Sequence, residues 1–183
     1  MKKENLSKLI LIRIDEEYIS YLRKYDSKVQ INSSALHKDN KPFVGVLFKI
    51  NNLKYFVPIS SNKKDKLSRM FNKYVETGKK PIDMFFIEEI HNDERKLLSV
   101  LNLNNMIPVC DSAIINYNIS QDKDYFLLRK EIEFCNLHKE KIISDSKRIY
   151  NAVTNHSWQS LENRCCNFKF LEEKCIYYQN QNI

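Results

Sequence analysis

The pattern of apolar residues changes near residue 120, and this change constrains the fold more than any other feature of the sequence. Short runs rich in β-branched and aromatic residues come before it, and long stretches with amphipathic helical spacing come after it. The chain has only two glycines and four prolines, which argues against a flexible linker. We therefore expect an α+β fold in a single domain, residues 1–183, with a β-rich core at about 8–119 and a helical part at about 122–180.

In the N-terminal part, a strand at 8–14 stops at Asp15, a residue that can cap a helix. Tyr18, Tyr21 and Tyr25 recur at three- and four-residue spacing and predict that this helix follows. Further strands are expected at 43–50, 53–59, 82–90, 96–103 and 112–119. Such short, mostly antiparallel strands favour a small, partly open β-barrel.

Two asparagines, Asn51 and Asn52, separate the second and third of these strands. Because asparagine tolerates positive φ, the pair predicts a tight hairpin. In the C-terminal part, near-heptad spacing over 125–153 predicts one long helix or two, and 168–180 predicts a last helix, all packed on the barrel. The charged runs at 92–96 and 139–148 are interpreted as helix surfaces.

The chain is basic, with 30 Lys and Arg against 23 Asp and Glu, a net charge of +7 and a pI near 9.1. This balance favours an anionic partner, either nucleic acid or an acidic membrane surface. No apolar run approaches the roughly 20 residues of a membrane span, so we expect a soluble, cytoplasmic protein. The five cysteines lack the spacing of a zinc site and are interpreted as reduced thiols that mostly fill the core.

The stretch "YFVPISSNKKDK" at 55–66 passes from a strand to two hydroxyls and then to lysines. If the hairpin forms, residues near 41 and near 60 lie at its open end. Lys41, Ser60, Ser61 and Lys63 would then share one end of the sheet.

These residue types suit cleavage of RNA by its own 2′-hydroxyl. The reaction needs a proton acceptor, cations that neutralise charge on phosphorus and a donor for the leaving oxygen, but no metal ion. Lysines supply charge, serines donate hydrogen bonds or relay a proton, and His37 can act as acid or base. The alternative is that Lys63, Lys64 and Lys66 form a solvated loop and that the serines merely end a strand.

Three ordered motifs then resemble a known family. "KPFVGVLFKINNLKYFVPISSNKK", "LNLNNMIPV" and "CNFKFLEEK" are similar to segments of the type III toxin-antitoxin endoribonucleases, the ToxN and AbiQ family, and the early helix "YISYLRKYDSKV" is similar as well. The resemblance implies an SH3-like, partly open barrel as in other RNA-cleaving toxins, and metal-independent, sequence-specific cleavage that needs no cofactor and leaves a 2′,3′-cyclic phosphate. It also implies inhibition by a repeated pseudoknot antitoxin RNA in a protein–RNA hetero-oligomer, and a role in abortive infection by phage.

By position in these motifs, Ser60 and Ser61 match the family's hydroxyl pair, Lys63 its catalytic-loop lysine and Lys41 the lysine before the hairpin. With His37, these form the expected catalytic set. The expected RNA-binding residues are Lys38, Lys64 and Lys66, and no metal ligand is expected.

Two features depart from the family pattern. Asn62 stands where a relative has proline, and His37 falls near a tyrosine of that relative. Two rival hypotheses are a non-catalytic RNA-binding module that uses the same basic groove and a barrel-type toxin that acts on a protein partner.

Overall fold

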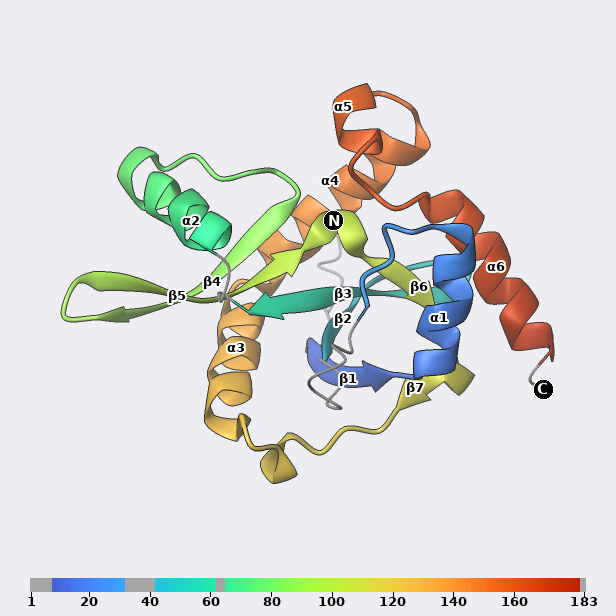
Figure 1. Cartoon of the computed structure of the whole chain (residues 1–183), viewed down its shortest axis with the longest axis horizontal. Coiled ribbons are helices and arrows are strands. Elements are labelled where there is room, and N and C mark those ends of the chain that lie inside the picture. The colour runs from blue at the N-terminus through green and yellow to red at the C-terminus, as the bar shows by residue number, and fades with distance from the viewer. Residues whose placement is uncertain (1–7, 32–41, 62–64, 182–183) are drawn as a thin grey trace, which may run out of the picture.

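The computed structural model describes residues 8–31, 42–61 and 65–181, which form an antiparallel sheet of seven strands surrounded by helices (Figure 1). The strands are β1 Ile10–Ile14, β2 Phe43–Ile50, β3 Leu53–Ser61, β4 Met84–His91, β5 Glu94–Asn102, β6 Ile107–Val109 and β7 Ile114–Ile115. The helices are α1 Glu16–Tyr25, α2 Asp65–Thr77, α3 Tyr125–Leu137, α4 Lys139–Thr154, α5 Gln159–Glu162 and α6 Phe168–Gln181. The predicted α+β class is confirmed, and the sheet is not closed.

Strand β3 pairs with three other strands of the sheet, β2, β5 and β6. The strand order is β4-β5-β3-β2-β1-β7, and β6 also pairs with β3. The N-terminal half of β3 pairs with β6, from Lys54 opposite Val109, whereas its last residues pair with β5, with Ser61 opposite Ser99. Strand β2 reaches only as far as Phe43, opposite Pro58, so in the described part of the chain the end of β3 pairs with β5.

Local sequence explains the elements that were predicted correctly. Asp15 caps α1, because its Oδ1 accepts hydrogen bonds from the backbone amides of Glu17 and Tyr18, at 2.6 and 3.2 Å. The hairpin of β2 and β3 turns at Asn51 and Asn52, whose φ angles are 47° and 68°. The two C-terminal helical stretches are present, and the first is divided into α3 and α4.

Three predictions about elements were wrong. The charged run at 92–96 is not a helix surface: Asn92 and Asp93 have positive φ and turn the hairpin of β4 and β5. Residues 112–119 form only the two-residue β7, because 3₁₀ turns occupy 111–113 and 119–121. Helix α2 was missed, and Lys66 lies within it and not in a loop.

The helices cover both faces of the sheet, and the alternation of side chains in β4 shows how. Phe86 contacts Phe71 of α2, with ring centroids 5.5 Å apart, whereas Phe85 contacts Phe134 of α3. Helix α2 packs through a small cluster that includes Leu67, and the main core lies on the side of α3, α4 and α6.

The main core explains why the helical part cannot separate from the sheet. Its buried side chains come from β1 through α6, and Tyr55, Tyr150 and Phe168 contact one another by their rings. All five cysteines are free and buried, as predicted for thiols that fill the core. Within the described ranges, no helix has both the length and the apolar character that crossing a membrane requires.

Candidate active site

The end of β3 carries the two serines that the sequence singled out. Ser60 and Ser61 are the last two residues of the strand, and both are half-buried. Strand β2 begins at Phe43, opposite Pro58, so the open end of the hairpin lies beside these serines. This arrangement agrees with the predicted register of the hairpin.

Five of the predicted site residues fall outside the described ranges. They are His37, Lys38, Lys41, Lys63 and Lys64. The hypothesis that the lysines meet Ser60 and Ser61 at one end of the sheet therefore stays a prediction. Of the predicted RNA-binding residues, Lys66 is described, and its side chain is exposed in the first turn of α2.

Ser60 belongs to a closed group of three polar side chains. Its Oγ accepts hydrogen bonds from Asn102 Nδ2 at 2.6 Å and from Gln30 Nε2 at 3.0 Å. Asn102 Nδ2 also donates to Gln30 Oε1, at 3.0 Å. Each of the three side chains thus contacts the other two, and the group joins the end of β3, the end of β5 and the segment after α1.

The two serines project toward opposite faces of the sheet, because successive residues of a strand alternate. Ser60 lies opposite Val100, which belongs to the cluster beneath α2. Ser61 lies opposite Ser99, a residue with only 1% of its surface exposed, whose buried Oγ has no hydrogen-bond partner among the described residues. The two hydroxyls therefore occupy different surroundings although they are adjacent in sequence.

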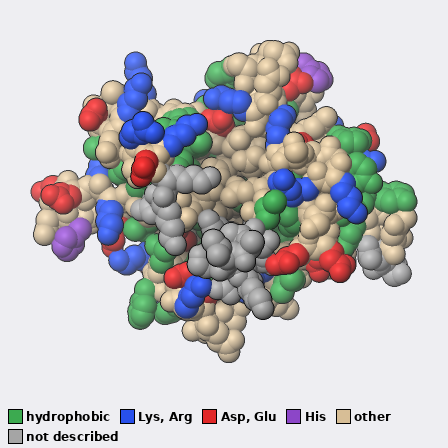
Figure 2. All heavy atoms as spheres, in the orientation of Figure 1, with side chains coloured by type: hydrophobic (Ala, Val, Ile, Leu, Met, Phe, Trp, Pro, Cys, Tyr) green, Lys and Arg blue, Asp and Glu red, His purple; other side chains and the backbone are tan. Residues whose placement is uncertain are grey.

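Helix α2 presents a basic surface on the same side of the sheet as Ser60. Lys66, Arg69 and Lys73 recur at three- and four-residue spacing and are all exposed, while Asp65 and Glu76 lie at the ends of the helix. Figure 2 shows basic side chains gathered over the region of α2. We call Lys66, Arg69 and Lys73 the basic face of α2.

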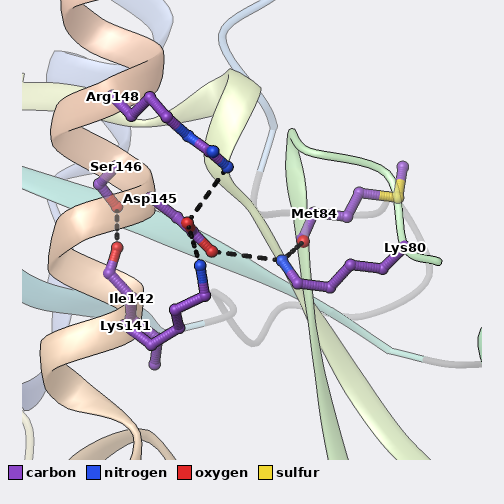
Figure 3. A network of polar contacts seen from close by, with 7 residues as sticks. All are labelled: Lys80, Met84, Lys141, Ile142, Asp145, Ser146 and Arg148. Carbon is purple, nitrogen blue, oxygen red and sulfur yellow. Dashed lines mark hydrogen bonds and ion pairs between the residues drawn. The ribbon is translucent and has the colours of Figure 1, made fainter. Parts of the chain in front are cut away.

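A buried carboxylate fixes the start of β4 to α4 (Figure 3). Asp145, which is 1% exposed, accepts Lys80 Nζ at 3.3 Å, Lys141 Nζ at 2.8 Å and Arg148 Nη2 at 3.3 Å. Lys80 Nζ also donates to the backbone oxygen of Met84. Burial lowers the pKa of Lys80, and the nearby Asp145 opposes that shift. This cluster holds the β4–β5 hairpin in place.

Within the described part of the chain, no group of three or more His, Cys, Asp or Glu side chains has the arrangement of a metal site. The side chains described at and near the end of β3 carry hydroxyls, amides and, on α2, cations.

A family comparison identifies the class of protein. The model of the family described as toxin ToxN of the type III toxin-antitoxin system matches residues 10–176, which is most of the chain. The chain belongs to this family. The matched region includes Ser60, Ser61, Gln30, Asn102 and the basic face of α2.

Individual members of the ToxN family support the same assignment. The chain is 35% identical over 179 residues to endoribonuclease ToxN of Bacillus thuringiensis subsp. kurstaki, covering 92% of this chain and 84% of the relative. It is 30% identical over 170 residues to endoribonuclease AbiQ of Lactococcus lactis subsp. lactis, covering 92% and 88%. An identity of 30% makes AbiQ a relative of this chain and not the same protein.

Solved structures agree with the sequence comparison. The structure of AbiQ, a lactococcal anti-phage endoribonuclease of a type III system, superposes with a TM-score of 0.81 at 27% identity and covers 95% of this chain and 99% of AbiQ. A second solved type III system, in which a non-coding RNA pseudoknot selectively inhibits the toxin, gives a TM-score of 0.75 at 31% identity and covers 94% of this chain and 99% of the solved chain.

Sequence reasoning missed Gln30 and Asn102. Asn102 lies inside the quoted motif "LNLNNMIPV", as a polar residue near the end of the strand expected at 96–103, and this position was a usable signal. Gln30 follows α1 with no motif of its own, and only the tertiary fold brings it to Ser60.

Proposed function

We propose that this chain is a metal-independent, sequence-specific endoribonuclease toxin whose active site lies at the end of β3. Its RNA substrate would be cleaved by attack of the 2′-hydroxyl on the adjacent phosphate, leaving a 2′,3′-cyclic phosphate. The observation that carries the proposal is the pair of hydroxyls at the end of β3, one of them oriented by two amides, beside a basic helix.

The roles of the site residues follow from the chemistry of the reaction. Ser61 contacts the scissile phosphate or relays the proton that the attacking 2′-hydroxyl loses. Ser60 donates a hydrogen bond to a phosphate oxygen. Lys41 and Lys63 neutralise charge that develops on phosphorus, and His37 serves as acid or base. The other proposed RNA contacts are Lys38, Lys64 and Lys66, which would bind phosphates.

The basic face of α2 extends this site into a surface for single-stranded RNA. Lysine and arginine neutralise phosphates whatever the base sequence, so the same surface can bind a substrate and an inhibitor. We propose that a repeated antitoxin RNA with a pseudoknot fold covers this surface and blocks cleavage, forming a protein–RNA hetero-oligomer in the cytoplasm. The pseudoknot inhibition of a type III toxin with a similar structure supports this proposal.

The proposal treats residues 1–183 as one toxin domain with an SH3-like, partly open barrel. Support for one domain comes from the main core, which includes side chains from β1 through α6. Support for the barrel comes from β3, which pairs with β2 along one side and with β6 and β5 along the other.

The test is cleavage of a cellular RNA pool in the presence of a chelator, with analysis of the product ends. Wild type should produce cyclic-phosphate ends, and Ser61→Ala should produce at least about a hundredfold fewer while still binding RNA. The matched control is Ser144→Ala, which removes an exposed hydroxyl from α4 and should cleave like wild type.

Other outcomes would favour a rival function. Tight RNA binding without cleavage by wild type would favour a non-catalytic RNA-binding module. Toxicity that persists when RNA binding is abolished would favour action on a protein partner. Equal cleavage by wild type and Ser61→Ala would remove Ser61 from the site.

A further inference from the structure

The hydroxyl of Ser60 has its accepting capacity filled by two amides. A serine hydroxyl offers one proton and two acceptor lone pairs. Both Gln30 Nε2 and Asn102 Nδ2 donate to Ser60 Oγ, at 3.0 and 2.6 Å. With both lone pairs occupied, Oγ cannot accept a third hydrogen bond or take up a proton unless one of the two hydrogen bonds breaks. The hydroxyl can still donate its own proton in a hydrogen bond.

A third hydrogen bond couples the orientations of the two amides to each other. Asn102 uses one N–H on Ser60 Oγ and the other on Gln30 Oε1, which leaves Gln30 Nε2 directed at Ser60. If Asn102 were reversed, its oxygen would face the Gln30 oxygen. Neither amide can therefore reverse alone, and in the arrangement that the structure has, Ser60 receives two hydrogen bonds.

We propose that Gln30 and Asn102 are positioning residues that hold Ser60 as a fixed hydrogen-bond donor to an oxygen of the RNA phosphate. This inference rests on the proposed function. It also assigns different roles to the two serines. A hydroxyl that already accepts two hydrogen bonds cannot relay a proton, so this role belongs to Ser61 on the other face of the strand. Donors that are already oriented cost no reorganisation when charge develops on the phosphate.

Neutral amides suit this role better than carboxylates. A carboxylate at position 102 would accept the proton of Ser60 and turn it away from the phosphate, and it would also repel the phosphate. Asn102→Asp therefore keeps the size of the side chain and reverses its hydrogen bonding. Gln30→Glu makes the same change from the other side of Ser60.

The experiment measures kcat and KM for cleavage of one short RNA substrate by wild type, Asn102→Asp, Gln30→Glu, Ser60→Ala and the double variant Ser60→Ala/Asn102→Asp. Ser60→Ala should lower kcat roughly a hundredfold, and each amide variant roughly ten- to a hundredfold, with smaller changes in KM. In the Ser60→Ala background, Asn102→Asp should lower kcat by clearly less than it does alone, because only the repulsion between the new carboxylate and the phosphate remains.

The pH profile separates positioning from a general loss of structure. In Asn102→Asp the introduced carboxyl donates again once it is protonated, so its deficit in kcat should shrink as pH falls toward the ordinary aspartate pKa of about 4. A loss caused by misfolding would show no such recovery. Asn151→Asp, on the exposed side of α4, adds the same charge elsewhere and should retain the kcat of wild type.

Three outcomes would overturn the inference. They are a wild-type kcat in both amide variants, losses that multiply in the double variant, and a deficit in Asn102→Asp that does not change with pH. In each of these the wild type still cleaves, so the proposed function stands. If the wild type cleaves no RNA at all, the proposed function fails and the inference fails with it.

Discussion

The polar clusters around Glu172 and Ser60 differ in charge and in their relation to solvent. Glu172 is 6% exposed, and its carboxylate accepts Tyr55 Oη at 2.9 Å, Tyr150 Oη at 2.6 Å and Lys169 Nζ at 3.1 Å. It connects β3, α4 and α6. The Ser60 cluster is neutral, half-buried and located where β3 ends.

This difference distinguishes a cluster that stabilises the fold from one that is available to a ligand. Around Glu172 both carboxylate oxygens accept hydrogen bonds from protein donors, and burial together with the bond to Glu172 raises the pKa of Tyr150. Around Ser60 the amides fill only the accepting side of the hydroxyl. The same strand thus carries a structural contact at Tyr55 and, at Ser60, the group that we propose is directed at a ligand.

The largest expected effect comes from removing the carboxylate of the structural cluster. Glu172→Ala leaves the hydroxyls of Tyr55 and Tyr150 and the Lys169 ammonium without their acceptor, and should lower the free energy of unfolding by roughly 3–5 kcal/mol. Urea denaturation measures this change. Glu173→Ala, on the exposed neighbour, should change it by about 0.5 kcal/mol at most. Similar losses in both variants would show that the Glu172 cluster does not stabilise the fold.

A smaller loss is expected at Asp145, where two of the three cations remain close to water. The side chains of Lys141 and Arg148 are 60% and 59% exposed, whereas that of Lys80 is 20% exposed. Asp145→Asn should lower the free energy of unfolding by roughly 1–3 kcal/mol, mainly through Lys80. Glu140→Gln is the control on the same helix. A loss as large as that of Glu172→Ala would mean that the solvent exposure of the three cations does not determine how much stability is lost.

The sequence predicted those features near the two clusters that depend on the local pattern of residues. The asparagine pair predicted the hairpin that places Ser60 and Ser61 at its open end, and Asp15 predicted the start of α1. These features follow from backbone preferences within a few residues. The charged turn at Asn92 and Asp93 was misinterpreted because exposed charge occurs on helices and hairpins alike.

The parts that the sequence could not predict depend on long-range contacts. Gln30 and Asn102 meet although they are 72 residues apart, and Glu172 meets Tyr55 across 117 residues. Buried polar residues such as Asp145 look like surface charge in a helical pattern, because the pattern does not show which elements pack against them. The missed helix α2 carries its apolar contacts on only a few residues, within a segment that composition marked as polar.

The smallest effect on stability, with a clear effect on RNA binding, is expected from the basic face of α2. Arg69 and Lys73 are exposed, so Arg69→Ala/Lys73→Ala should change the free energy of unfolding by about 0.5 kcal/mol at most. If both neutralise phosphates of single-stranded RNA, the slope of log affinity against log salt should fall by about 1.4, which is about 0.7 for each lost contact. Filter binding over a range of salt concentrations measures this slope, and Lys24→Ala on α1 should leave it unchanged. An unchanged slope in the double variant would show that RNA does not bind along α2. The proposed RNA-binding surface would then be limited to the end of β3.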